Sequence, residues 1–127
     1  MTNKWEEFTK GKKIAIGKPL AKIVGEVNLF INAVWINSYN LNNYEYVNVY
    51  TQDNGDKWLI GFEFTNEKKD NSFKLSHAQN QISRVISVSS LFRVLKIDSK
   101  KYKEEYFEPK KEKLGDKIIF VIEIKKR

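Results

Sequence analysis

Cysteine is absent from this 127-residue chain, and histidine, proline and arginine are scarce, with one, two and three residues respectively. Without cysteine the chain can form no disulfide, no thiolate nucleophile and no cysteine-ligated zinc site. No apolar run is long enough to cross a membrane as a helix, and no apolar stretch follows the charged N-terminus as it would in a secretory signal. We therefore expect an intracellular, cytoplasmic protein with no membrane partner.

Residues suited to catalysis are also few. The single histidine, His77, lies among polar residues and lacks the serine–aspartate framework that a catalytic triad needs. The adjacent pairs Glu6/Glu7 and Glu104/Glu105 point in different directions on a strand or a helix, whereas catalytic carboxylates converge in a cleft. No glycine-rich phosphate loop, EF-hand or helix-borne zinc motif is present. The sequence therefore predicts a protein that is not an enzyme and that carries no cofactor and no metal.

What the chain does contain is enough apolar material for a core. Apolar residues make up 41% of the chain and aromatic residues 13%, which is unlike the composition of disordered proteins. The length suits one domain. We expect a single domain over residues 1–127, with a lead-in segment at 1–11 and a solvated basic tail at 125–127.

Strand patterns dominate the chain. The runs 44–51 and 57–65 flank Asp53-Asn54-Gly55-Asp56, and an Asn-Gly pair favours a type I′ hairpin turn. Alternation in the second run predicts that Ile60 and Phe62 lie on a buried face. Further strands are expected at 21–30, with a bulge at Gly25, and at 72–76, 85–88 and 118–124.

Two helices are expected between these strands. The first spans 32–41, with Asn32 as its N-cap and Trp35 away from the apolar stripe. The second spans 87–97, where Val88, Phe92 and Leu95 form one apolar stripe. The predicted class is α+β: a mostly antiparallel sheet of about five to seven strands with two short helices packed on it.

Charge is distributed unevenly along the chain. The formal net charge is +7, and residues 77–127 contribute thirteen Lys and Arg against seven acids, which gives +6. Residues 31–76 have four Lys against six acids, which gives −2. Basic ends around a slightly acidic middle favour an anionic partner. Twenty of the twenty-three basic residues are Lys, a bias that an AT-rich coding sequence also produces, and Arg is the better reader of phosphate and guanine.

Basic residues interleaved with aromatic ones form the best candidate site. Lysines pair with phosphates, and an exposed tyrosine stacks on a base, so this pattern predicts a DNA or RNA interface. If the last two strands form a hairpin, the charged loop 110–113 becomes a basic finger. The candidate binding residues are Lys100, Lys101, Tyr102, Lys103, Tyr106, Lys110, Lys111 and Lys113, with Arg93 and Lys96 on the exposed side of the second helix.

Two other interpretations stay open. The patch is equally explained by a charged, soluble hairpin whose aromatic residues are buried, because glutamates dilute it. Alternatively, a semi-exposed sheet face docks a protein partner, as in an assembly subunit of a mobile element or a homo-oligomer. The residues of this face are Tyr44, Tyr46, Tyr50 and Leu59.

One distant resemblance concerns the first half of the chain. The segment Gly25-Glu26-Val27-Asn28-Leu29, a short helix and Tyr44–Tyr50 together resemble the strand–helix–strand layout of AbrB-like swapped-hairpin DNA-binding domains, over about a fifth of the chain. The Pro-Lys pair that opens the helix in that family and the glycine that follows it are missing. The resemblance implies DNA binding but assigns no site residue.

Overall fold

Ten strands, two α-helices and one 3₁₀ helix form the part of the chain that the computed structural model describes, residues 17–78, 82–103 and 105–127. The expected lead-in segment 1–11 lies outside this part. The α+β class is confirmed. The elements are β1 (Ala21–Val24), β2 (Asn28–Ile31), α1 (Ala33–Ser38), β3 (Tyr46–Asp53), β4 (Lys57–Thr65), β5 (Phe73–Lys74), β6 (Ser76–His77), β7 (Arg84–Ser87), α2 (Ser89–Leu95), η1 (Ser99–Tyr102), β8 (Tyr106–Phe107), β9 (Lys110–Leu114) and β10 (Lys117–Lys125).

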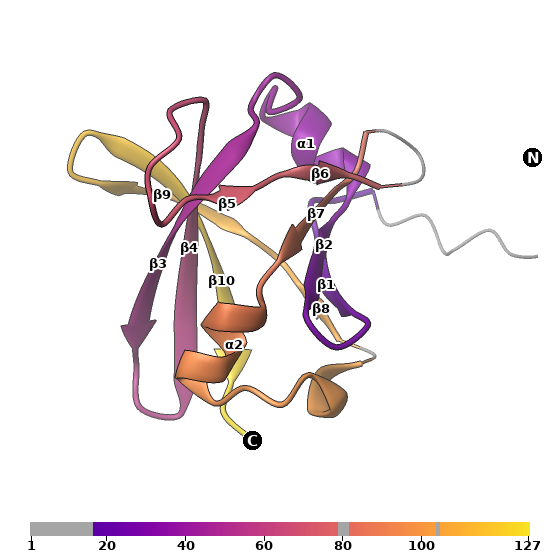
Figure 1. Cartoon of the computed structure of the whole chain (residues 1–127), viewed down its shortest axis with the longest axis vertical. Coiled ribbons are helices and arrows are strands. Elements are labelled where there is room, and N and C mark those ends of the chain that lie inside the picture. The colour runs from indigo at the N-terminus through magenta and orange to yellow at the C-terminus, as the bar shows by residue number, and fades with distance from the viewer. Residues whose placement is uncertain (1–16, 79–81, 104) are drawn as a thin grey trace, which may run out of the picture.

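The strands form two antiparallel sheets of five strands each. The first sheet has the order β6-β7-β2-β1-β8, and the second has the order β5-β3-β4-β10-β9. Short links join the edge strands of one sheet to those of the other. β5 continues into β6 through Leu75, and β8 continues into β9 through Glu108 and Pro109. The strands therefore form a ring around one core, and both crossings can be followed in Figure 1.

Trp35 lies at the centre of this core, with none of its surface exposed. Its ring centroid is 6.2 Å from those of Phe62 and Phe64 and 5.9 Å from that of Phe120. The prediction that Trp35 lies away from the buried stripe was wrong, because α1 is only six residues long and packs Trp35 and Ile36 inward. The N-cap prediction is confirmed: the Asn32 side chain accepts a hydrogen bond from the Trp35 backbone N–H at 3.0 Å.

The central hairpin β3–β4 is confirmed, but its turn differs from the prediction. Asp53 pairs with Trp58, and the Asn54 N–H donates to the Lys57 carbonyl at 2.9 Å, so the two central residues are Gly55 and Asp56. Only Gly55 has a positive φ, +82°. A glycine with positive φ at the first central position is the pattern of a type II′ turn, not of type I′.

Three other predicted segments fold differently. Residues 21–30 do not form one bulged strand but the β1–β2 hairpin, which turns at Gly25 with φ +62°. The expected strand 72–76 divides into β5 and β6, one in each sheet. The expected charged loop 110–113 is part of strand β9, hydrogen-bonded to β10.

The basic tail is anchored. The Lys126 N–H donates to the Asp56 carbonyl at 2.8 Å, and its ammonium group lies 2.6 Å from an Asp53 carboxylate oxygen and 4.6 Å from the centroid of the Trp58 ring. Arg127 pairs with Glu105. All three tail residues are exposed to solvent, and these contacts hold the chain end across the β3–β4 turn.

The helices are short. The predicted apolar stripe of the second helix is confirmed in α2, where Phe92 is 5% exposed. Its N-cap is Val88, whose side chain makes no capping hydrogen bond. Within the described residues, no helix is long and apolar enough to cross a membrane.

Candidate nucleic-acid interface

The predicted binding residues form two groups at different ends of the molecule. One group lies on α2, on η1 and on the residues just after them, and the other lies on β9. Figure 1 shows α2 and η1 near the C-terminus of the chain, whereas β9 runs toward the opposite end. The elements that contribute the two groups therefore lie at different ends of the molecule.

In the first group, three cations converge. Arg93, Lys96 and Lys100 line one open hollow of about 500 Å³, and we call these three residues the α2–η1 cluster. Lys101 and Lys103 are exposed on the same segment. The carboxylates of Glu26 and Asp98 also line the hollow, so cations outnumber acids there by three to two.

The convergence follows from how α2 ends. Lys96 adopts the left-handed conformation with φ +58°, and its N–H donates to the Arg93 carbonyl at 3.3 Å. The Ile97 N–H donates to the Phe92 carbonyl at 2.9 Å. These two bonds form a Schellman motif, which reverses the chain. Asp98 then caps η1 by accepting from the Lys100 N–H at 3.1 Å, so Lys100 comes to lie beside the end of α2.

No member of the α2–η1 cluster is used in the ion pairs of the described residues. Those five pairs are Lys18–Glu108, Lys57–Glu123, Lys117–Glu63, Lys126–Asp53 and Arg127–Glu105. The cations that tie elements together are thus different from those that line the hollow.

In the second group, the strand geometry separates the lysines. Lys110 pairs with Val121, Lys111 with Phe120 and Lys113 with Ile118. Because side chains alternate along a strand, Lys110 projects to one face and Lys111 and Lys113 project to the other. The predicted basic finger does not form. β9 is the last strand of its sheet and all five of its residues are exposed, and lysines on an edge strand discourage pairing with another chain.

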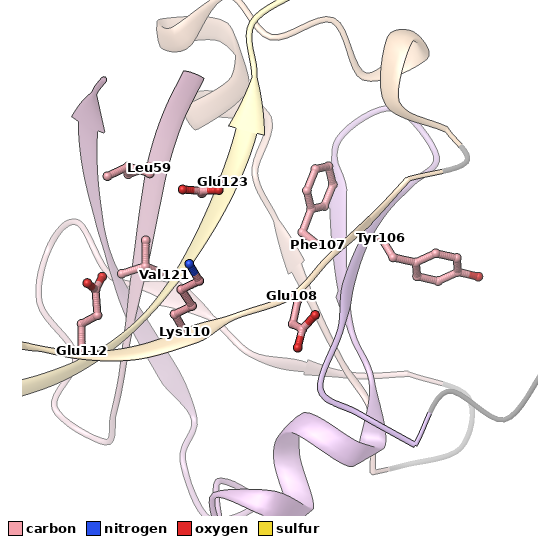
Figure 2. A pocket seen from close by; sticks show the side chains of 8 residues that line it. All are labelled: Leu59, Tyr106, Phe107, Glu108, Lys110, Glu112, Val121 and Glu123. Carbon is pink, nitrogen blue, oxygen red and sulfur yellow. The ribbon is translucent and has the colours of Figure 1, made fainter. Parts of the chain in front are cut away.

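Lys110 lies beside three glutamates. It lines a hollow of about 430 Å³ together with Glu108, Glu112 and Glu123, above Leu59 and Val121; Figure 2 shows these side chains around the hollow. The hydrogen bond that Lys57 donates to Glu123 at 2.7 Å lowers the pKa of that carboxyl group. Two of these carboxylates are already ion-paired, Glu108 with Lys18 and Glu123 with Lys57, so this hollow offers no excess of positive charge to a phosphate.

The two predicted stacking tyrosines have different environments. Tyr102 is 3% exposed and its hydroxyl donates to the Lys125 carbonyl at 2.5 Å, and burial raises its pKa. Tyr102 therefore has no face for a base, which corrects the prediction. Tyr106 is 46% exposed, with the Lys22 ammonium 5.4 Å from its ring centroid, and Figure 2 shows its ring pointing away from Phe107.

The three arginines also differ in their exposure and in their partners. Arg84 is 3% exposed and donates to the Asn42 carbonyl at 3.2 Å, and burial lowers its pKa. Arg127 is held by Glu105 and by the Lys101 carbonyl. Arg93 is thus the arginine that the described fold leaves exposed and outside its ion pairs.

The predicted tyrosine face is divided as well. Tyr44 lies against Phe64, with ring centroids 6.5 Å apart. Tyr50 donates to a Glu63 carboxylate oxygen at 2.9 Å, and Asn48 donates to the same oxygen at 3.0 Å. These contacts turn Tyr44 and Tyr50 toward different neighbours.

One feature was not predicted from the sequence, a third hollow lined by Tyr39, Tyr44, Phe64 and Phe120. Its residues come from four separate parts of the chain, and no spacing in the sequence indicates that they meet.

Among the described residues, no group of three or more His, Cys, Asp or Glu side chains is placed to hold a metal ion. Comparison of the chain with protein-family models, with curated proteins and with solved structures finds no match in any of the three.

Proposed function

We propose that this protein is a non-enzymatic nucleic-acid-binding domain that contacts the phosphate backbone through the α2–η1 cluster. The observation that supports the proposal is that Arg93, Lys96 and Lys100 line one hollow while other cations make the ion pairs of the described fold. A concave surface lined by cations concentrates positive potential and attracts a polyanion.

The same residues indicate limited sequence discrimination. Phosphate contacts position a nucleic acid but carry no sequence information, whereas bases are read by planar, bidentate groups, of which Arg is the commonest. The cluster has one Arg and two Lys. Affinity for different sequences should therefore be similar.

Salt should weaken this binding in a way that can be calculated. Each neutralised phosphate contributes about −0.9 to the slope of log K against log salt on duplex DNA, so three contacts give a slope of about −3. Between about 50 and 200 mM salt, the affinity should then fall by about fortyfold.

The test is fluorescence anisotropy with labelled single-stranded and duplex DNA and RNA over a series of salt concentrations. The variant Arg93→Gln/Lys96→Gln/Lys100→Gln should lose most binding, and its salt slope should be less steep by about 3. The matched control is Lys68→Gln/Lys69→Gln/Lys74→Gln, which removes the same charge from exposed residues of the β4–β5 turn and β5.

The control should keep the wild-type slope, because the β4–β5 turn and β5 lie apart from α2 (Figure 1). Equal losses in both variants would show that only net charge matters and would refute the cluster as the site. Absence of wild-type binding at micromolar protein and low salt would refute the function itself. Thermal unfolding of each variant confirms that it is folded.

A further inference from the structure

A hollow of about 310 Å³ opens between the end of α1 and strands β4, β9 and β10, and we call it the aromatic hollow. Its walls are Tyr39 at the C-cap of α1, Tyr44 before β3, Phe64 on β4 and Phe120 on β10. The ring centroids of Tyr39 and Phe120 are 4.7 Å apart, and those of Phe64 and Phe120 are 5.7 Å apart. The volume is at the lower end of the range for ligand pockets, which suits a small planar group.

The rim of the aromatic hollow exposes apolar surface. Tyr44 is 36% exposed and Ile118 is 45% exposed, whereas Phe64 and Phe120 are 9% and 4% exposed. Exposed apolar side chains that rim a hollow with an aromatic floor are typical of a binding site.

The charge of the aromatic hollow is positive. Lys111 is the single charged side chain among the described residues that line it, and its ammonium group is 5.8 Å from the centroid of the Tyr39 ring. The pairing of Lys111 with Phe120 places it directly beside the floor. The hollow around Lys110 differs, because its lining includes three glutamates, two of which are ion-paired.

The rim also provides hydrogen-bonding groups. Ser38 and Asn40 line the aromatic hollow, and a hydroxyl and an amide supply both donors and acceptors. Asn40 has φ +56°, and this left-handed residue turns the chain out of α1 between Tyr39 and Leu41. A planar ring with polar edges and an adjacent anion would match the aromatic walls, the polar rim and Lys111.

We propose that the aromatic hollow binds a nucleobase that carries a phosphate, with the ring against the tyrosines and the phosphate at Lys111. Proteins hold unpaired bases by stacking them on aromatic side chains. A base inside a duplex has its faces covered, so the ligand is a free nucleotide or an unpaired base of a single strand. This inference does not depend on the α2–η1 contact, because the aromatic hollow is lined by the end of α1, and α1 lies apart from α2 (Figure 1).

The test follows the isoleucine methyl groups by NMR. The probes are adenosine and uridine 5′-monophosphates, a short single-stranded oligonucleotide and the same strand annealed to its complement. The Ile118 methyl signal should shift, whereas that of Ile86, which is fully buried in the first sheet, should not. A response to the monophosphates identifies the free nucleotide as a ligand, and a response to the single strand alone identifies an unpaired base.

Two variants and a matched control test the assigned roles. Tyr44→Ala should weaken binding by about tenfold or more, because it removes a stacking partner. Lys111→Gln should weaken it by about two- to fivefold, as expected for an exposed charge pair. Lys110→Gln, the neighbouring residue on the other face of β9, should change it by less.

Three results would overturn the proposal: no Ile118 shift with any single-stranded or monomeric probe, an equal shift with the duplex, or equal losses in Lys110→Gln and Lys111→Gln. The α2–η1 triple variant separates the two proposals. It should lose oligonucleotide affinity while a nucleotide response at Ile118 remains.

Discussion

The α2–η1 cluster and strand β9 contain similar numbers of exposed cations but arrange them differently. At the end of α2, the reversal at Lys96 brings Arg93 and Lys100 to the same hollow. On β9, Lys110 lines a hollow with three glutamates, Lys111 lines the aromatic hollow on the other face, and Lys113 lines neither of these two. The comparison shows that a run of lysines in a sequence becomes a patch only where the backbone makes the side chains converge.

The two regions are also attached to the body in different ways. α2 is held by apolar packing, with Phe92 in the core. β9, whose residues are all exposed, is held by its hydrogen-bond ladder to β10. Lys117 also ties down this hairpin, because its ammonium group lies 3.9 Å from a Glu63 carboxylate oxygen and 3.4 Å from the Tyr50 hydroxyl. Each attachment can be broken separately.

The largest effect is expected from Phe92→Ala. This change should lower the free energy of unfolding by about 3–5 kcal/mol, because it removes a buried aromatic ring and leaves a cavity. Leu114→Ala on β9, where the side chain is 45% exposed, should change it by no more than about 0.5 kcal/mol. Urea unfolding measures both values. Similar losses in the two variants would contradict the claim that apolar packing holds α2 but not β9.

A smaller effect is expected at Glu63. Partial burial favours the neutral acid, but hydrogen bonds from Asn48 and Tyr50 and the charge of Lys117 outweigh it and lower the Glu63 pKa below its ordinary 4.5. A lowered folded-state pKa stabilises the fold above pH 4.5, and this contribution is lost as pH falls through the folded value. Glu63→Gln should therefore cost about 1 kcal/mol at neutral pH and little in acid.

Urea unfolding between neutral pH and acid gives the two stability curves. They should converge as the pH falls below 4.5, the ordinary value for this carboxyl group. Tyr50→Phe removes one of the two hydrogen bonds from side-chain donors and should show a smaller part of the same dependence. Parallel curves for wild type and Glu63→Gln would exclude Glu63 as the source of this pH dependence of stability.

The smallest effect is expected from Lys96→Gly, and it separates backbone strain from charge. Glycine adopts a positive φ without steric strain, so the variant should be more stable by about 0.5–1 kcal/mol. It should also bind nucleic acid more weakly, because one cluster cation is lost. Thermal unfolding and anisotropy measure the two quantities, and weaker binding together with lower stability would contradict this interpretation.

Local patterns in the sequence predicted the local structure. The β3–β4 hairpin and the strand through Phe120 and Ile122 have a clear alternation of apolar residues, and this period depends only on near neighbours. The burial of Tyr102 was not predictable in the same way. It depends on the chain end packing over its ring, with the Arg127 guanidinium 5.0 Å from the ring centroid.

The sites were predicted only in part. Arg93, Lys96 and Lys100 were identified as exposed cations, but their convergence depends on the left-handed conformation of a lysine, which residue type does not favour. The aromatic hollow was missed because Tyr39, Phe64 and Phe120 are far apart in sequence and meet only when α1 packs against the second sheet.

The crossing of β8 into β9 has a consequence for the order of folding. Ala21 on β1 pairs with Phe107 on β8, 86 positions later in the chain, and pairings between such distant residues form slowly. Until β8 is synthesised and pairs with β1, the β1–β2 hairpin has one unpaired edge. Premature termination anywhere before Phe107 would release a chain whose first strand has an exposed edge.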